Sequence, residues 1–187
     1  MNPISYKIVA RSHDVLFQSR FPWHLSGRCI SLLAAGLLLL LGCSAGDDHF
    51  SPWMADGPLR NDGSLAFFRP DGSEIVSVLV EIAETHESIS KGLMGRRSLD
   101  SKSGMLFLFR KAEFRAFWMR NTPLPLDIIF VGENSCVSNI ARRTEPMSDR
   151  TYYSKGPVKF VVEVRAGFSE QYGITQGTCI RWQRRKE

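Results

Sequence analysis

The chain has 187 residues, of which 43% are hydrophobic and 23% are charged. These are values of ordinary globular proteins, and they exclude a collagen-like, wholly disordered or disulfide-packed chain. The formal net charge is +5, but the residues after position 43 contain 20 bases and 18 acids, a balance of only +2. A nearly neutral domain gives no electrostatic support for nucleic-acid binding, so no nucleic-acid partner is expected.

The first clear feature is an almost unbroken apolar stretch over residues 30–41. Its length of about 12 residues is too short for a bilayer-spanning helix but suits the core of an export signal. The stretch ends in Leu40-Leu41-Gly42-Cys43, which resembles a bacterial lipobox, where the cysteine is acylated and the chain is cut before it. The alternative is an ordinary buried helix that ends at Gly42. Because the chain turns small and polar directly after Cys43, residues 1–42 are predicted to be a lipoprotein signal peptide.

The signal predicts an exported protein that is held in the cell envelope by lipid on Cys43. Several acyl chains on one cysteine would anchor the domain firmly in the membrane, whereas a single chain binds only marginally. Ser44 stands where an aspartate would resemble an inner-membrane retention signal. In a Gram-negative cell we therefore expect the outer membrane, facing the periplasm. Residues 43–62 are predicted to be a flexible tether, and residues 63–187 a single globular domain.

The first part of this domain is predicted to contain a hairpin and a short helix. Strands at 65–68 and 75–83 flank Pro70-Asp71-Gly72, whose residue types suit a turn. Thr85 is placed to cap a helix over residues 86–94. Two more strands are expected, at 105–109 and 116–119.

The second part is predicted to be richer in strands. A hairpin over 126–131 and 135–140 turns at Gly132-Glu133-Asn134, and a polar loop is expected over 143–156. The remaining expected elements are strands at 158–165 and 178–182 and one helical turn at 168–172. Many short strands with one or two short helices predict a mainly β (α+β) fold, a compact sheet that is closed or half-closed into a barrel.

Two cysteines remain in the predicted domain, Cys136 and Cys179. In an oxidising compartment such a pair favours a disulfide, with two free buried thiols as the alternative. Their separation of 43 residues would give a stabilisation of about 3–4 kcal/mol on the chain-entropy model. A zinc site is not expected, because there is no CxxC motif and only His49 and His86 remain after the signal. No cofactor is predicted.

Four motifs follow one another between residues 92 and 130: Gly92-Leu93-Met94, Gly104-Met105-Leu106-Phe107, Phe117-Trp118-Met119-Arg120-Asn121-Thr122 and Pro125-Leu126-Asp127-Ile128-Ile129-Phe130. Their order and spacing resemble the family of domains of unknown function numbered 192, over about residues 76–182. Glu163-Val164-Arg165-Ala166-Gly167 is similar to the C-terminal strand and turn of that family. The resemblance implies a small, often exported and mainly β domain, and it implies no established activity.

Side chains suited to ligand binding gather in the third motif. If its strand continues, Trp118 and Arg120 share one face. The indole could stack on a sugar ring, and the guanidinium could bind a carboxylate or a phosphate. The alternatives are a tryptophan that belongs to the core or its rim, and an Arg120 that pairs with Asp127 or Glu163.

Asn121 and Thr122 either join the same candidate ligand site or form a turn whose side chains bond to their own backbone. Asp127 and Glu163 each interrupt an apolar run, where an unpartnered carboxylate is costly. Asp127 therefore faces water, bonds to the turn at 121–123 or lines a pocket. If Asp127 and Glu163 lie on neighbouring strands, they are the one pair suited to acid–base catalysis.

Two short basic runs complete the candidates. Arg96 and Arg97 follow the predicted helix and could hold an anion, with an exposed basic pair as the alternative. Arg184-Arg185-Lys186 is expected to be a frayed, solvated tail. No GxSxG motif, credible Ser–His or Cys–His arrangement, or glycine-rich phosphate loop is present. No catalytic residue is therefore assigned.

Three functions stay open. The favoured one is a lipid-anchored envelope binding or accessory module that holds a small polar ligand, a glycan or a protein partner. The second is an envelope hydrolase that uses Asp127 and Glu163, which requires carboxyl groups about 5–5.5 or 6.5–9.5 Å apart. The third is a purely structural envelope protein. The candidate ligand site consists of Trp118, Arg120, Asn121, Thr122, Asp127 and Glu163.

Overall fold

The computed structural model describes residues 5–6 and 59–186. Cys43, most of the predicted tether and all of the predicted signal peptide except residues 5–6 lie outside the described residues. Within the described part of the chain, no helix combines the length and the apolar character that crossing a membrane requires.

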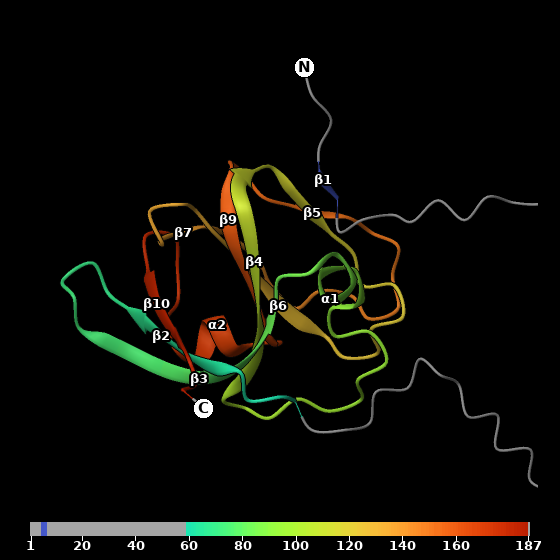
Figure 1. Cartoon of the computed structure of the whole chain (residues 1–187), viewed down its shortest axis with the longest axis horizontal. Coiled ribbons are helices and arrows are strands. Elements are labelled where there is room, and N and C mark those ends of the chain that lie inside the picture. The colour runs from blue at the N-terminus through green and yellow to red at the C-terminus, as the bar shows by residue number, and fades with distance from the viewer. Residues whose placement is uncertain (1–4, 7–58, 187) are drawn as a thin grey trace, which may run out of the picture. The chain divides into compact units, whose positions relative to one another are not determined.

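The domain is mainly β, and its largest element is a seven-stranded mixed sheet (Figure 1). The order of strands in this sheet is β10-β2-β3-β4-β9-β6-β7. Their bounds are β2 (Gly63–Phe68), β3 (Glu74–Ala83), β4 (Ser103–Glu113), β6 (Leu126–Val131), β7 (Val137–Ala141), β9 (Val158–Arg165) and β10 (Cys179–Arg184). A smaller sheet has the order β1-β5-β8 and consists of β1 (Ser5–Tyr6), β5 (Arg115–Phe117) and β8 (Tyr152–Tyr153). Two short helices, α1 (His86–Lys91) and α2 (Phe168–Gln171), complete the described elements.

Both predicted hairpins are present, as β2–β3 and β6–β7. The first turn forms because the Asp71 carboxylate accepts bonds from the backbone nitrogen and the hydroxyl of Ser73, at 2.8 and 2.6 Å. These two bonds hold the pKa of Asp71 below its ordinary value. Gly72 has a φ of +85°, a backbone conformation that glycine adopts without strain.

The helix α1 begins where the sequence predicted and ends three residues early. The Thr85 hydroxyl accepts a bond from the Ser88 backbone nitrogen at 3.1 Å, and the Ser88 hydroxyl accepts one from the Thr85 nitrogen at 3.0 Å. This reciprocal pair is a capping box. The predicted end at residue 94 is wrong, because Gly92 turns to a φ of 50° and terminates the helix after Lys91.

Other differences from the predicted elements follow from backbone pairing. β4 extends past residue 109, since Glu113 at its polar end pairs with Val158 of β9. The predicted strand at 116–119 begins at Arg115 and stops at Phe117. The predicted loop over 143–156 contains β8, which pairs with β5. The basic run at the C-terminus is not wholly frayed, because Arg184 pairs with Gly63 at the end of β10.

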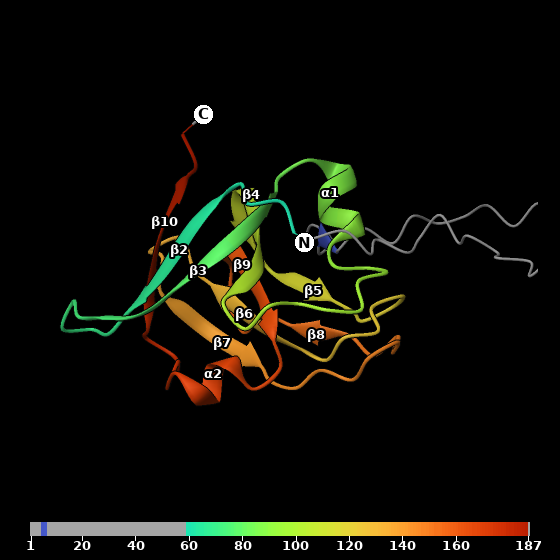
Figure 2. The same cartoon turned by 90° about the horizontal axis from the view of Figure 1, so that it is seen from below.

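The strands β4, β9 and β6 bury both of their faces, which gives the domain two hydrophobic clusters. Residues alternate between the two faces of these strands. We call the cluster that contains Ile129 and Val162 the inner cluster, and the one that contains Phe130 and Val161 the outer cluster. In Figures 1 and 2, β2, β3 and β10 lie on one side of these strands, and α1 and β5 on the other. All six residues of β6 are buried, which explains why its sequence is almost continuously apolar.

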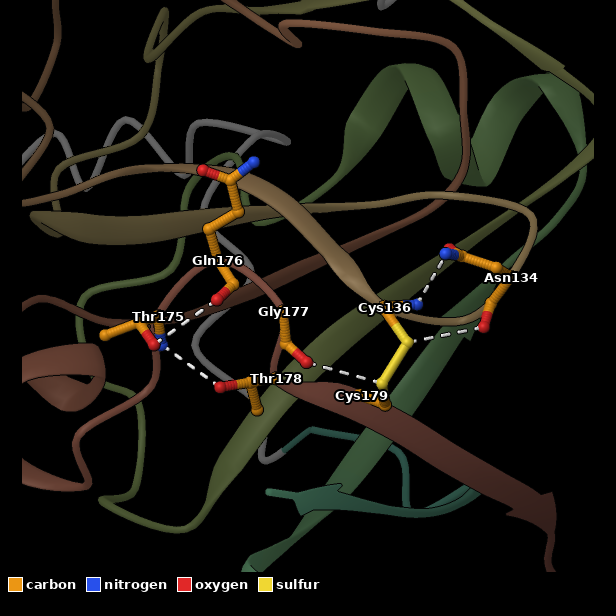
Figure 3. Close-up of a disulfide and its surroundings, with 7 residues drawn as sticks. All are labelled: Asn134, Cys136, Thr175, Gln176, Gly177, Thr178 and Cys179. Atoms are coloured by element: carbon orange, nitrogen blue, oxygen red, sulfur yellow. Dashed lines mark hydrogen bonds between the residues drawn. A yellow bond between two sulfur atoms is a disulfide. The ribbon is translucent and has the colours of Figure 1, made fainter. Parts of the chain in front are cut away.

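The sheet is half-closed, because its two edge strands meet at one end. Cys136, just before β7, forms a disulfide with Cys179 at the start of β10, with an S–S distance of 2.02 Å (Figure 3). Beside it, the backbone nitrogen of Val137 donates to Thr178 and that of Ile180 donates to Ser135, both at 2.7 Å. The predicted mainly β, half-closed barrel-like sheet is confirmed.

Candidate functional site

Trp118 and Arg120 are in contact at the surface, although the strand expected to place them on one face ends at Phe117. The guanidinium carbon of Arg120 lies 4.1 Å from the centroid of the indole ring and therefore covers one of its faces. Arg120 Nε donates to Asp149 Oδ1 at 2.7 Å, and both side chains are exposed. The expected pairing of Arg120 with Asp127 or Glu163 is wrong. Asp149 takes that place because the loop that carries it folds back onto the turn, where Met119 N donates to Ser148 O.

Asn121 and Thr122 form the turn that the sequence offered as the alternative to a ligand site. Asn121 has a φ of 54°, and its carbonyl accepts a bond from Gly95 at 2.7 Å. The Thr122 side chain is buried, and its hydroxyl donates to the carbonyl of Arg120 at 3.3 Å. The Thr122 carbonyl accepts a bond from Met147 at 3.0 Å. These contacts fix the turn against two neighbouring loops.

Asp127 is completely buried and binds three backbone nitrogens. Its Oδ1 accepts bonds from Arg143 at 2.9 Å and Gly167 at 3.2 Å, and its Oδ2 accepts one from Ser169 at 2.9 Å. The expectation that Asp127 faces water, bonds to the turn at 121–123 or lines a pocket is therefore wrong. The sequence pattern could not identify these partners, because they lie 16 to 42 residues further along the chain.

Glu163 is also completely buried, but it lies on the opposite face of the sheet. In the β6–β9 register, Asp127 pairs with Val164, whereas Glu163 pairs with Ile128. Val164 belongs to the inner cluster and Ile128 to the outer one, so alternation directs the two carboxylates to different sides. The predicted acid–base pair does not form, although the two residues are on neighbouring strands.

A cavity of about 410 Å³ opens beside Asp127, at the start of β6 and the end of β9. We call it the arginine pocket, because three arginines line it. Its lining consists of residues 97–99, 124–126 and 165–166 and Arg143. None of the six predicted site residues is part of this lining.

Backbone pairing brings the walls of the arginine pocket together. Leu126 pairs with Arg165 across β6 and β9, and the Ala166 nitrogen donates to the Pro125 carbonyl at 3.1 Å. On the other side, Thr144, the residue after Arg143, donates its nitrogen to the Leu126 carbonyl at 2.8 Å. The pocket therefore stands on the rigid ends of two central strands.

Arg143 is the most constrained of the three arginines. Its backbone has a φ of 47°, an uncommon conformation outside glycine, and Asp127 holds it there through the backbone nitrogen. The guanidinium packs against Gly167, where a Cβ would lie 3.3 Å from Nη2. Nη2 also donates to Glu170 Oε2 at 2.6 Å, and this hydrogen bond raises the pKa of Arg143. The side chain is nevertheless 62% exposed, so this ion pair lies at the surface.

The adjacent arginines 96 and 97 have different environments. Arg96 forms an ion pair with Glu81 at 2.8 Å, and both side chains are largely buried. Arg97 is exposed and lines the arginine pocket. The expected exposed basic pair is therefore only half present, because Arg96 is largely buried and Arg97 is exposed.

Sequence reasoning missed Arg143 and Arg165 as site residues. Arg165 falls within the C-terminal motif Glu163-Val164-Arg165-Ala166-Gly167, and that motif is the signal that could have identified it. No comparable signal marks Arg143, because its position depends on a bond to Asp127 from another strand.

A larger cavity of about 580 Å³ lies near Thr85 and the C-terminal strand. Two of its arginines have acidic partners: Arg60 pairs with Asp62 and Glu81, and Arg184 pairs with Glu84. Arg185 and Lys186 also line this cavity, and its lining includes the carboxylates of Asp62 and Glu84. Within the described residues, no cluster of three or more His, Cys, Asp or Glu side chains could hold a metal ion.

Comparison with known proteins identifies the family. No curated protein matches the sequence. Among solved structures, a proposed transcription regulator from Sinorhizobium meliloti 1021 is similar, with a TM-score of 0.63 and 28% identity over 68% of this chain and 97% of the other. A protein of unknown function from Novosphingobium aromaticivorans DSM 12444 has a TM-score of 0.61 and 35% identity over 64% of this chain and 84% of the other.

The profile of the family of domains of unknown function 192, described as "Uncharacterized ACR", matches residues 67–182. This range contains β3, β4, β6 and β9, both walls of the arginine pocket and all four sequence motifs. The chain belongs to the domain of unknown function 192 family.

Proposed function

We propose that this protein is a lipid-anchored binding module of the cell envelope and that the arginine pocket holds its ligand. The observation that carries the binding role is the pocket itself, in which three arginines surround a partly apolar floor at the ends of two central strands. Concave sites with a few converging polar groups are where small ligands bind. Anchoring is supported by the apolar stretch over 30–41 and the lipobox-like residues that end at Cys43.

Binding fits the geometry better than the hydrolase alternative. Asp127 and Glu163 face opposite sides of the sheet, so they cannot act on one bond together. Among the described residues that line the arginine pocket there is no acid, histidine or cysteine. The lining can therefore neutralise and orient a ligand, but it has no group suited to general acid–base work near neutral pH.

A purely structural role accounts for part of the motif pattern. Asp127 and Thr122 are buried and bonded to backbone groups, so the fold alone explains them. The fold does not explain Arg165, an exposed arginine with no ion pair within residues 59–186. A binding role would account for an exposed arginine at this position.

The experiment is a thermal-shift screen against glycans, sugar phosphates, amino acids and small organic acids. Protein purified from cells that express the whole chain is compared with Ser98→Trp, which places an indole in the pocket lining. Ser101→Trp adds the same group to an exposed turn outside the pocket and is the matched control. A ligand that binds only the folded state raises Tm.

We expect at least one compound to raise the Tm of the wild type and of Ser101→Trp but not that of Ser98→Trp. A shift that persists in Ser98→Trp would contradict the assignment of the site. No shift with any compound would leave the pocket without a ligand and would overturn the binding role.

A further inference from the structure

We infer that the ligand of the arginine pocket is a small organic anion, with carboxylate or phosphate oxygens at the arginines and an apolar part against Leu99 and Leu124. This inference rests on the proposed function and specifies the class of ligand.

The charge of the pocket carries the first step. Arg97, Arg143 and Arg165 line one cavity, and the lining residues that the structure describes include no acidic side chain. Glu170 bonds Arg143 from outside the lining, whereas Arg165 forms no ion pair within residues 59–186. Arg165 therefore offers an uncompensated charge, and planar guanidinium groups match the oxygens of carboxylates and phosphates.

Preorganisation carries the second step. Asp127 binds the backbone of both Arg143 and Gly167, so one buried carboxylate fixes the two segments that bear Arg143 and Arg165. The Arg143 guanidinium lies against Gly167 and bonds to Glu170, and its side chain is 62% exposed to a ligand. An anion that meets cations on an ordered backbone loses less free energy to ordering them.

The apolar part of the pocket carries the third step. Leu99 has 9% of its surface exposed, and Leu124 is partly buried against the outer cluster. Both line the cavity together with Pro125. The volume of about 410 Å³ is near the lower end of the range for small-molecule sites. A bare inorganic anion would leave the leucines uncovered, so a compact organic group attached to the anion fits best.

The experiment measures binding of four probes by calorimetry, using protein purified from cells that express the whole chain. Benzoate and phenyl phosphate carry an anion and an apolar ring, benzyl alcohol carries the ring alone, and inorganic phosphate carries the charge alone. Each probe is titrated into the wild type, Arg165→Gln and Arg110→Gln. Arg110 is an exposed arginine of β4 outside the pocket, so its variant matches the loss of charge.

We expect benzoate or phenyl phosphate to bind at least tenfold more tightly than benzyl alcohol or inorganic phosphate. Arg165→Gln should weaken that binding about tenfold, which corresponds to about 1.4 kcal/mol, whereas Arg110→Gln should leave it within twofold. Whichever of the two anions binds better identifies the anionic group. An unchanged Tm of the unliganded Arg165→Gln variant shows that the loss is not a folding defect.

Other results would overturn the inference. If benzyl alcohol binds as tightly as the anions and Ser98→Trp abolishes its binding, the pocket is a binding site but its ligand is not an anion. If Arg165→Gln and Arg110→Gln bind the anions equally, the arginine pocket does not select charge. If none of the four probes binds while another compound shifts the wild type but not Ser98→Trp, the proposed function stands and the anion inference fails.

Discussion

Asp127 is the residue on which the candidate site depends most. A carboxylate with no exposed surface is unfavourable unless its oxygens are bonded, and Asp127 satisfies this with three backbone nitrogens. Those nitrogens belong to Arg143, which lines the arginine pocket, and to Gly167 and Ser169, which follow its last lining residue. We therefore expect Asp127 to position Arg143 and the corner at 165–167, and not to transfer protons.

Asp127→Asn is predicted to destabilise the domain by about 2–4 kcal/mol. The amide oxygen can keep two of the bonds, but the amide nitrogen then faces the third donor, and the charge that strengthened all three is lost. Urea unfolding of the whole chain, followed by tryptophan fluorescence, measures the change.

Asp149→Asn is the control for this measurement. It removes the same charge from an exposed ion pair with Arg120, and such pairs contribute about 0–1 kcal/mol. Equal destabilisation by the two variants would contradict the structural role of Asp127.

The residue scale also shows what the sequence could predict of the site. The contact between Trp118 and Arg120 is observed, but strand alternation does not produce it, because β5 ends at Phe117. The partners of Arg120 and Asp127 are different, because Asp149 and Ser169 lie 29 and 42 residues away. Strand order and register decide such contacts, and a single sequence taken by itself does not reveal them.

At the scale of elements, the half-closed sheet brings its two edge strands together. The disulfide between Cys136 and Cys179 joins them, with backbone hydrogen bonds on either side of it. An open sheet edge can pair with another chain. Closure at this end therefore protects part of β7 and β10 as well as stabilising the fold.

The double variant Cys136→Ser, Cys179→Ser is predicted to lower the free energy of unfolding by about 3–4 kcal/mol. The separation of 43 residues means that the link removes considerable entropy from the unfolded chain. Chemical unfolding with and without reductant measures it. The reduced wild type should match the double variant, and an oxidised wild type no more stable than the variant would contradict this role.

Sequence reasoning was most successful for elements whose pattern is local. The strand at 158–165 and both hairpins agree with the prediction, because alternation and turn residues determine them. It was least successful for β8 and for the polar end of β4, where pairing with β5 and β9 supplies the backbone bonds that the side chains do not signal.

At the scale of the whole molecule, two hydrophobic clusters share the strands β4, β9 and β6. The arginine pocket lies where β6 begins and β9 ends, and Leu99, Leu124 and Leu126 of its lining belong to or pack against the outer cluster. This placement brings three exposed arginines to the ends of two central strands. The predicted tether would then keep this rigid domain within reach of the membrane surface.

Cys43→Ser is predicted to release the protein from membranes into the soluble envelope fraction. Without the thiol no acyl chain can be attached, and the anchor is lost. Fractionation of cells that express the whole chain, with immunoblotting, measures the change. Cys136→Ser, which leaves the lipobox-like residues intact, should stay with the membranes. Unchanged membrane retention of Cys43→Ser would contradict lipid anchoring.

The most direct test of the arginine pocket is an NMR titration of the ¹⁵N-labelled protein with phenyl phosphate and benzoate. Saturable shifts are predicted for the backbone amides at 97–99 and 165–166 and for Arg143, with no shift of the Trp118 indole. Shifts centred on Trp118 and Asn121 would place the ligand beside the stacked side chains of Trp118 and Arg120 and not in the arginine pocket. No saturable shift with either anion would contradict an anion site in the arginine pocket.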